Sequence, residues 1–564
     1  MNITISDITF SDGSQIKLPA DGLVVLVGPN NVGKSRALRD IKGFLETDGY
    51  VGTVLTQVTF DRSQEDIVTW ADEHVPVTFQ DGPKKFRLPN GHLLSPEYLK
   101  MYWRSAGIGP LIDLFLTLLN AETRLTTGDR RQNISYGDET PTHPIHHAFE
   151  NSQIEAFVSN ESKATFGLGA VVDRLGGSTV ELRIGDIPEY RHDNGAPDPA
   201  YISALKELPP LQEQGDGVRS YLGLLLHLAT SNEQILLIDE PEAFLHPPQA
   251  RRLGQVLAER AETQQVLLAT HSSDILIGAL SANAPITIIR ITRDENGNHP
   301  AELNAAAVKE FWSDPLLRYS NLLDGLFHDG VVLCEGDGDC RFYGAVLDAI
   351  SSDSGLSGDR EPQILFSHCG GKSRMHSVVG SLSSVGIPVA AICDIDILSD
   401  RTDVEKLLKA LTSDLIEPTE YESKLNVLSS GVQDLGEQVR RSDLRTTINE
   451  ALDGVSTELV SSSELKKLQK MCRKESGWVS LKRTGLGGLP GGDVSAAGKE
   501  LVELFKSKGL FVVPVGELER FAPEIPGHGP AWVSAALDAE QHLPGKTPAT
   551  SFIRELRNWI ATAT

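Results

Sequence analysis

Four carboxylates that follow two apolar segments in the second half of the chain have the types and spacing of a metal site. The run GVVLC ends at Glu335, with Asp339 four residues later, and the run IPVAAIC ends at Asp394 and Asp396. Alternate residues of a strand point the same way, and the carboxyl ends of parallel strands meet at one edge of a sheet. Carboxylate oxygens suit Mg²⁺ or Mn²⁺ rather than zinc. The pattern therefore predicts a magnesium or manganese site made of these four residues.

A single acidic turn is weaker evidence, because an isolated acid after a strand is more often a helix cap or a loop residue. Two such turns, each closing an apolar run, favour the metal interpretation. A calcium-binding EF-hand loop is excluded for the first turn. Counted from Asp337, that loop requires glycine at its sixth position and glutamate at its twelfth, where the chain has Phe342 and Asp348.

The first half of the chain carries a phosphate-binding loop. GPNNVGKS, which follows the apolar run GLVVLV, matches the full GxxxxGKS/T pattern. Its glycines let backbone N–H groups surround the phosphates, Lys34 reaches the β- and γ-phosphates, and Ser35 is a ligand for Mg²⁺. The residues predicted to bind the nucleotide here are Gly28, Asn30, Asn31, Gly33, Lys34 and Ser35.

Two further segments complete the predicted nucleotide site. The apolar run QILLI ends at Asp239 and Glu240, where the aspartate can hold Mg²⁺ and the glutamate can orient the attacking water. His271 comes directly after VLLAT, which places it to sense the γ-phosphate. A single histidine after a strand is more often structural, but its combination with the other two motifs favours the functional interpretation.

The elements that must hold these residues are strand–loop–helix units of an α/β fold. The phosphate loop, LLIDEPE and ATHS together resemble ABC-type ATPases, in the branch that includes DNA-repair and SMC-like proteins. GDGVRS, within residues 213–225, stands where that family has its signature loop; it departs from LSGGQ and is similar to a variant of stand-alone ATPases in this branch. The resemblance implies ATP binding and a homo-oligomer, a dimer or tetramer, formed through the ATPase domains. Gln57 is either a Q-loop residue or a solvent-facing strand residue.

Glu335 followed by Asp394-x-Asp396 resembles the Toprim domain of topoisomerases, primases and nucleases, and HCGGKSRMHSVV is similar to the glycine turn of that fold. An ABC-type ATPase followed by a Toprim domain resembles the OLD (overcoming lysogenization defect) family of nucleases, which includes the nuclease subunit of the Gabija antiphage system. The resemblance implies an α/β chain with an ABC-type (P-loop) ATPase domain at 1–312 and a Toprim Rossmann-like domain at 325–564.

The same resemblance assigns roles in the C-terminal part of the chain. The segment GLFVVPVGELE is expected to form a strand that ends at Glu517 and Glu519. GELE is similar to a late acidic motif of the family, which places these two residues as further metal ligands. Lys546 stands where the family tends to have an essential lysine. Lys482 and Arg483, in SLKRT, are the alternative source of positive charge. A single lysine is usually a solvated surface residue, so this choice rests on the family pattern. The catalytic residues implied are Glu335, Asp339, Asp394, Asp396, Lys546 and, in the ATPase, Glu240.

Two regions carry less information. Residues 60–210 form a variable region that is a candidate for dimerisation elements. Its histidines His143, His146 and His147 have no carboxylate or cysteine at ligand spacing, so a solvated loop is expected rather than a metal site. Residues 400–470 are expected to form a helical insert. Two apolar stripes at helical spacing support it: Leu407, Leu408, Leu411 and Leu415, and Leu428, Val432, Leu435 and Val439.

The composition is typical of a globular protein with several domains. The chain has 564 residues, of which 40% are hydrophobic and 23% charged, enough for two to four domains. It has no apolar run long enough for a membrane span, no signal-peptide pattern at the N-terminus, and five cysteines without a CxxC pair, so a cytoplasmic location is expected. The net charge of −25 opposes general affinity for nucleic acid but leaves room for a local basic groove.

Together these observations predict an ATP-regulated DNA endonuclease that depends on Mg²⁺ or Mn²⁺. The family implies a role in antiphage defence with a partner protein encoded alongside, and no membrane is expected to take part. Regulation by ATP is favoured over a motor, because no helicase motifs accompany the phosphate loop. The alternative is an ATP-driven DNA-binding clamp or sensor whose Toprim domain is not catalytic. A topoisomerase or a primase is disfavoured by the ATPase-first order and the lack of CxxC pairs.

Overall fold

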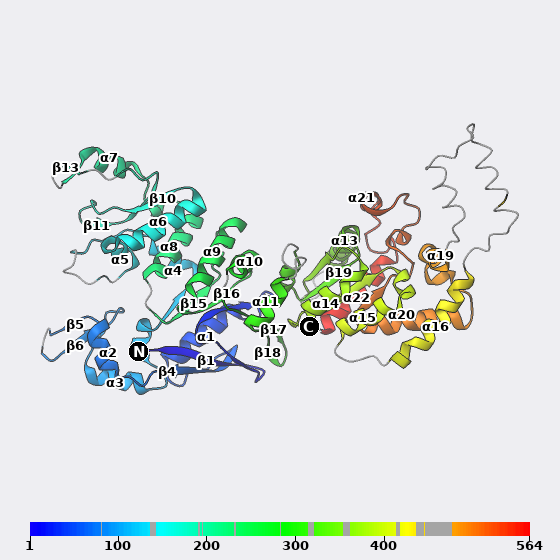
Figure 1. Cartoon of the computed structure of the whole chain (residues 1–564), viewed down its shortest axis with the longest axis horizontal. Coiled ribbons are helices and arrows are strands. Elements are labelled where there is room, and N and C mark those ends of the chain that lie inside the picture. Colours follow the sequence, from blue (N-terminus) through cyan, green and yellow to red (C-terminus); the bar gives the residue numbers. More distant parts are fainter. Residues whose placement is uncertain are drawn as a thin grey trace. The chain divides into compact units, whose positions relative to one another are not determined.

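The computed structural model describes residues 1–563 except 80–81, 136–140, 142, 190–191, 194–195, 231–232, 283, 314–320, 354–360, 413–417, 436–444 and 446–475. The chain divides into two compact units, Met1–Tyr319 and Ser320–Thr564, which are described separately (Figure 1). None of the described helices is long and apolar enough to cross a membrane.

The first unit is built on a six-stranded sheet with the order β18-β17-β3-β16-β15-β8. Its strands are β3 (Gly22–Val27), β8 (Leu116–Leu119), β15 (Ile235–Asp239), β16 (Gln265–Ala269), β17 (Ile286–Asp294) and β18 (Gly297–Leu303). Neighbouring strands are parallel except β17 and β18. Strand β3 is buried along its whole length, which is why it reads GLVVLV without polar alternation. The parallel strands therefore end at one edge, where the nucleotide motifs follow them.

A smaller antiparallel sheet, β2-β1-β4, shares its core with the large sheet. It consists of β1 (Ile3–Phe10), β2 (Gln15–Lys17) and β4 (Leu55–Arg62). The main helices of the first unit are α1 (Lys34–Glu46), α8 (Asp216–Thr230), α9 (Pro247–Arg260) and α10 (Ser273–Ser281). Gln57 lies on β4 with an exposed side chain.

The region between β4 and α8 is made of short elements. It includes α2 (Ile67–His74), β5 (Val77–Thr78), β6 (Lys85–Arg87), β7 (Leu93–Leu94), α3 (Pro96–Arg104), α4 (Ala121–Thr127), β9 (Arg131–Gln132), α5 (Pro144–Glu150), α6 (Ser152–Phe166), β10 (Gly169–Val172), β11 (Thr179–Val180), β12 (Leu182–Gly185), β13 (His192–Asp193), β14 (Ala196–Pro197) and α7 (Pro199–Glu207). The expected solvated loop at the three histidines is wrong. Helix α5 contains two of them, and burial lowers the pKa of its N-cap residue His143 to about 3.

The second unit contains a four-stranded parallel sheet with the order β20-β19-β21-β22. Its strands are β19 (Gly330–Cys334), β20 (Ile364–His368), β21 (Val389–Cys393) and β22 (Leu510–Val512). The α-helices in the described part of this unit are α13 (Asp337–Asp353), α14 (Lys372–Ser383), α15 (Arg401–Leu411), α16 (Pro418–Asp434), α19 (Gly477–Thr484), α20 (Asp493–Ser507), α21 (Gly529–Asp538) and α22 (Ala549–Ala563). Both units combine parallel sheets with helices, so the predicted α/β fold class is confirmed.

The structure bears on two local expectations for the second unit, the helical insert and the strand before GELE. Helices α15 and α16 lie within the expected helical insert, while Leu415 and Val439 fall outside the described residues. The segment before GELE is not one long strand: β22 ends at Val512, and Glu517 comes after a turn at Gly516, which has φ +110. The proline at position 514 has no N–H to continue a strand ladder, which explains the early end.

Candidate nucleotide and metal sites

The phosphate loop joins the end of β3 to the start of α1. Gly28 has φ +139, and a Cβ atom there would lie 2.2 Å from the carbonyl oxygen of Ile291, so only glycine fits. Gly33, with φ +100, directly precedes α1. Asn30 and Asn31 lie exposed in the loop between these glycines, and Asn31 also has a positive φ. The loop is thus held in the strained shape that exposes backbone N–H groups to an anion.

Lys34 is buried and folds back over its own loop. Its Nζ donates hydrogen bonds to the carbonyl oxygens of Gly28, at 2.6 Å, and Pro29, at 2.9 Å. Burial lowers the pKa of Lys34 to about 8, although the carboxylates at the end of β15 act in the opposite direction. Ser35 follows it in the first turn of α1. A nucleotide phosphate would offer Lys34 a charged partner in place of the two carbonyls.

Three acids gather at the end of β15, beside the loop that follows β16. Asp239 is the last residue of the strand, and its Oδ1 is buried without a hydrogen bond to any described residue. The Nε2 of His271 lies 3.6 Å from Oε1 of Glu240, which has φ +47. The Oε1 of Glu242 accepts a hydrogen bond of 2.7 Å from the backbone N–H of His271. The unsatisfied oxygen of Asp239 is what a magnesium ligand requires, so the residues present fit the ion that accompanies ATP.

Two residues of this site were missed in the sequence. Glu242 stands in the quoted motif DEPE, two residues after Glu240, and its spacing was a signal that could have been used. Arg124, on α4, donates hydrogen bonds of 2.8 Å to the carbonyl oxygens of Asp239 and of Glu240. The sequence around Arg124 gives no signal of this role, because the two residues it binds lie more than a hundred residues further along the chain.

The acids of the second unit converge at the carboxyl ends of β19 and β21. One oxygen each of Glu335, Asp394 and Asp396 lie within 4.8 Å of one another. Glu335 Oε1 also accepts a hydrogen bond of 2.9 Å from the backbone N–H of Asp394. Asp339 is set apart: it lies in the first turn of α13, and its Oδ2 accepts from the N–H of Gly336 at 2.8 Å. The structure thus brings three of the four predicted acids into one group.

Burial and mutual repulsion perturb these acids. Burial, together with the charge of Asp394, raises the pKa of Glu335 to about 7. The same two causes raise the pKa of Asp339 to about 6. Burial also raises the pKa of Asp394, against the stabilising hydrogen bond from Lys482. Buried carboxylates that are costly to ionise together are a suitable donor set for a divalent cation.

Two lysines supply positive charge to this acid cluster. Lys372, the first residue of α14, lies 3.2 Å from Oε1 of Glu335 and forms an ion pair with Asp396. Lys482, on α19, lies 2.7 Å from Oδ2 of Asp394 and 3.7 Å from Asp396. Lys482 was the predicted alternative source of charge, whereas Lys372 was missed although it lies in the quoted HCGGKSRM segment. All ligand atoms are carboxylate oxygens, so the cluster fits Mg²⁺ or Mn²⁺.

The late acidic motif forms a second group. Oxygens of Glu517 and Glu519 lie within 4.8 Å of each other and of a ring nitrogen of His528. Glu517 accepts a hydrogen bond from Arg520 at 3.2 Å, and Glu519 accepts one from a backbone N–H at 2.9 Å. Lys546 is exposed just before α22, and none of the ion pairs among the described residues joins it to either acid group.

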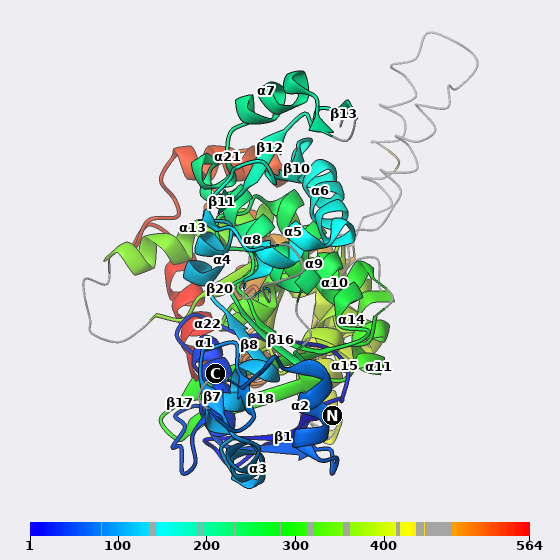
Figure 2. The same cartoon turned by 90° about the vertical axis from the view of Figure 1, so that its left-hand side faces the viewer.

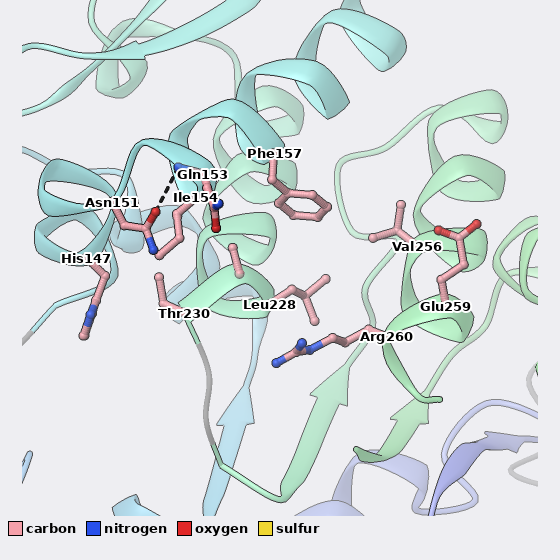
Figure 3. A pocket seen from close by; sticks show the side chains of 11 residues that line it. His147, Asn151, Gln153, Ile154, Phe157, Leu228, Thr230, Val256, Glu259 and Arg260 are labelled. Atoms are coloured by element: carbon pink, nitrogen blue, oxygen red, sulfur yellow. Dashed lines mark hydrogen bonds between the residues drawn. The ribbon is translucent and has the colours of Figure 1, made fainter. Parts of the chain in front are cut away.

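A separate pocket of about 540 Å³ opens between α5, α6, α8 and α9 (Figure 3). Side chains that include His147, Phe157 and Arg260 line it. Asn151 hydrogen-bonds the backbone N–H of Gln153 at its rim. None of the predicted site residues is among its lining, so it is not part of either candidate site.

Comparison with protein families matches two segments of the chain. Residues 202–277 match the family described as "AAA domain, putative AbiEii toxin, Type IV TA system". This segment contains the signature-like GDGVRS, Asp239 and His271. Residues 326–396 match the family described as "Overcoming lysogenization defect protein-like, TOPRIM domain". This second segment runs from the strand before Glu335 to Asp396.

Several solved structures are similar to the chain. An SMC head bound to the C-winged helix domain of ScpA is 13% identical, with a TM-score of 0.35, and covers 54% of this chain and 99% of its own. The SMC head domain from Thermotoga maritima is 14% identical, with a TM-score of 0.29, and covers 54% and 100%. The protein cbiO1 from Clostridium perfringens, part of the ABC transporter complex cbiONQ, is 14% identical, with a TM-score of 0.28, and covers 57% and 94%. No curated protein sequence matches the chain.

The order of the two matched segments agrees with the order of the two chemical centres. The nucleotide motifs lie in the first unit, and the acid cluster lies in the second. The predicted resemblance is confirmed by the family matches. The chain carries an AAA-type ATPase domain followed by an OLD-like TOPRIM domain, which is the arrangement of an OLD-family ATPase–Toprim fusion.

Proposed function

We propose that this chain is an ATP-regulated DNA endonuclease that depends on a divalent cation, Mg²⁺ or Mn²⁺. The single observation that carries the proposal is the convergence of Glu335, Asp394 and Asp396 within 4.8 Å, inside the segment that matches an OLD-like TOPRIM domain. The two domains together support an ATP-dependent, nuclease-like function. The proposal further includes DNA as the substrate, a requirement for a divalent metal and a role in antiphage defence.

In this proposal the three acids hold the cation together with Asp339, whose pKa is raised by burial and in part by the charge of Asp394, and Glu517 and Glu519 hold a second cation. The chemistry supplied by such ions is activation of water and neutralisation of charge on the phosphate. Lys372 and Lys482 lie among the same carboxylates, so their ammonium groups are placed to offset charge on a phosphodiester bound there. Lys546 is retained as the family-based candidate for the assisting lysine.

The nucleotide part of the proposal assigns ATP to the first unit. Gly28, Asn30, Asn31, Gly33, Lys34 and Ser35 would bind the phosphates, with Asp239, Glu240 and His271 at the γ-phosphate. We propose an ATPase domain over 1–312 and a Toprim domain over 325–564, with pairing of two or four chains through the ATPase domains and a partner protein encoded alongside. Glu240 would orient the attacking water.

Cleavage of plasmid DNA tests the proposal. Purified protein is incubated with supercoiled plasmid and Mg²⁺ or Mn²⁺, with and without ATP, and compared with Glu335→Ala and Lys34→Ala. Nicked or linear products that require the metal are expected from the wild type. Glu335→Ala should lower the rate at least about a hundredfold, since it removes a ligand of the site.

Asp337→Ala is the matched control, because Asp337 lies in the same helical turn as Asp339 and is exposed, with an ion pair to Arg341. It should cleave like the wild type. No metal-dependent cleavage under any condition would contradict the nuclease. ATP-dependent DNA binding without cleavage would instead favour the clamp or sensor with a non-catalytic Toprim domain.

A further inference from the structure

Arg124 is a buried cation without a carboxylate partner. Its side chain is completely buried, and none of the ion pairs among the described residues includes it. Burial lowers the pKa of Arg124 to about 10, against the charges of Glu242, Asp239 and Glu240, so the guanidinium remains charged at neutral pH. A buried unpaired charge is unfavourable unless its donors are satisfied, so its position calls for a physical reason.

The fold places Arg124 at the carboxyl end of β15, the strand that carries Asp239. Strand β8 runs parallel to β15, with Leu119 opposite Ile238, so α4 begins beside the carboxyl end of β15. Asn120 caps α4: its side chain accepts from the N–H of Thr123, whose hydroxyl accepts from the N–H of Asn120. Arg124 follows one turn later, and its three donor nitrogens are all used for hydrogen bonds to the neighbouring elements.

Two of these hydrogen bonds hold the backbone of the acids. Nη1 donates to the carbonyl of Asp239 and Nη2 to the carbonyl of Glu240, each at 2.8 Å. Glu240 has φ +47, a left-handed conformation that is unfavourable for a residue with a Cβ atom. The backbone N–H of Glu240 is fixed from the other side by a 2.8 Å hydrogen bond to the carbonyl of Ala269. Arg124 therefore helps to hold the strained backbone that aims the Glu240 carboxylate.

The third hydrogen bond reaches the segment that resembles a signature loop. Nε of Arg124 donates to the hydroxyl of Ser220, at 3.2 Å, and Ser220 closes the GDGVRS sequence at the start of α8. Helices α4 and α8 lie side by side in both views of the molecule (Figures 1 and 2). Their backbones meet at Gly223, where a Cβ atom would lie 2.0 Å from the carbonyl oxygen of Arg124. One buried side chain thus connects α8 directly to Glu240.

We propose that Arg124 is a positioning residue that links the first turns of α8 to the backbone of Asp239 and Glu240. When a ligand binds the N-terminal segment of α8 and displaces this helix, the hydrogen bonds of Ser220 and Arg124 transmit the displacement to the carbonyl of Glu240. The rate of ATP hydrolysis then depends on the state of α8 without any contact between Arg124 and the nucleotide. This inference rests on the proposed ATPase activity.

Steady-state ATP hydrolysis with three variants tests the link. Arg124→Lys keeps a charge but cannot span both carbonyls and the hydroxyl, and should lower kcat at least about tenfold. Ser220→Ala removes one hydrogen bond and should lower kcat about fivefold. The double variant should fall no further than Arg124→Lys alone, because the two changes break the same connection. KM for ATP and the affinity for a fluorescent ATP analogue should stay within about twofold, since the phosphate loop is untouched.

Matched controls separate this link from general packing. Arg174 also donates to two backbone carbonyls, those of Phe149 and Ala148, and Ser162 is a buried serine that donates to the carbonyl of Leu168. Arg174→Lys and Ser162→Ala should leave kcat unchanged in folded protein. If Arg124→Lys does not fold, Ser220→Ala alone carries the comparison.

Wild-type kcat in folded Ser220→Ala would overturn the inference, and so would a loss of ATP binding in proportion to the loss of kcat. A wild-type chain that hydrolyses no ATP would instead contradict the proposed ATPase activity itself. Normal wild-type hydrolysis with unaffected variants would contradict only the role of Arg124.

Discussion

Each carboxylate of the three-acid group in the second unit has an ammonium partner. Lys372 contacts Glu335 and Asp396, and Lys482 contacts Asp394. These ammonium groups and a divalent cation would compete for the same oxygens, because both are attracted by the same negative charge. The lysines are therefore expected to stabilise the acid cluster in the absence of metal and to weaken the binding of metal.

Lys372→Met tests this competition at the level of one side chain. Methionine keeps the length of the stem but removes the charge, so Mn²⁺ should bind about tenfold more tightly, the effect of about 1.4 kcal/mol. The melting temperature of the metal-free protein should fall, because Glu335 and Asp396 lose a counter-charge. Isothermal titration with Mn²⁺ and thermal unfolding measure the two effects.

The control for this prediction is Lys409→Met, which removes the lysine of a surface pair with Glu405 on α15. It should change neither the affinity for Mn²⁺ nor, beyond about 0.5 kcal/mol, the stability. Weaker binding of Mn²⁺ by Lys372→Met would show that Lys372 supports the bound cation instead of competing with it.

The raised pKa values of the acids predict how metal binding depends on pH. The pKa of Glu335 is raised to about 7 and that of Asp339 to about 6, so the folded, metal-free protein holds protons that the unfolded chain releases. The contribution of these two acids to the free energy of unfolding is fully present below their pKa values in the unfolded chain, which are about 4. It is lost as the pH rises through their pKa values in the folded protein. A metal ion needs the ionised carboxylates, so Mn²⁺ affinity should fall as the pH is lowered from about 8 to about 6.

Titrations in two buffers of different ionisation enthalpy measure the protons released on binding. Proton release should be larger at the lower pH and smaller in Glu335→Gln, which cannot ionise. An affinity that does not change over this range of pH would mean that these acids are not the ligands.

Among the elements, the turn between β3 and α1 requires glycine at position 28. Gly28→Ala would place a Cβ atom 2.2 Å from the carbonyl oxygen of Ile291 on β17, in addition to its unfavourable φ of +139. The turn must then move, so ATP binding should be lost and the melting temperature should fall. Binding of a fluorescent ATP analogue and thermal unfolding report the two effects.

Gly49→Ala separates backbone strain from steric overlap. Gly49 has φ +71, also left-handed, but no atom lies within 4 Å of a Cβ atom built there. It should cost about 1 kcal/mol of stability and leave ATP binding intact. Equal loss of ATP binding in both variants would mean that the contact with Ile291 does not shape the phosphate loop.

At the scale of the whole molecule, the net charge limits how the chain can bind DNA. The chain carries a net charge of −25, which would repel DNA, so a nuclease of this composition needs local positive charge at its acid cluster. Lys372, Lys482 and bound cations would provide it. The nucleotide motifs and the acid cluster belong to different compact units. Lys34→Ala in the plasmid assay measures the effect of ATP on cleavage.

Local motifs were predictable because their function depends on residues close together in sequence. The phosphate loop, Asp239 with Glu240, and Glu335 each follow an apolar strand, as expected. The expectation that Asp394 and Asp396 lie on a strand was wrong: β21 ends at Cys393, and Asp396 lies in the 3-10 helix Ile395–Ser399. The expectation of a solvated loop at His143, His146 and His147 was wrong, since apolar residues beside them bury a short helix. The long strand expected before Glu517 was also wrong, because the turn at Gly516 interrupts it.

The sequence by itself determined the order of the two domains, the α/β class and the residues at the ends of the strands, since strand periodicity and loop chemistry are local properties. Only the tertiary structure decided which side chains complete the sites. Arg124, Lys372 and Lys482 are single basic residues that occur in any sequence, and the sheet order and helix packing place them among acids far away along the chain. Glu242 is local in sequence, but its role became visible only with the position of His271. Long-range contacts carry no local signature, because burial and charge pairing are set by the packed fold.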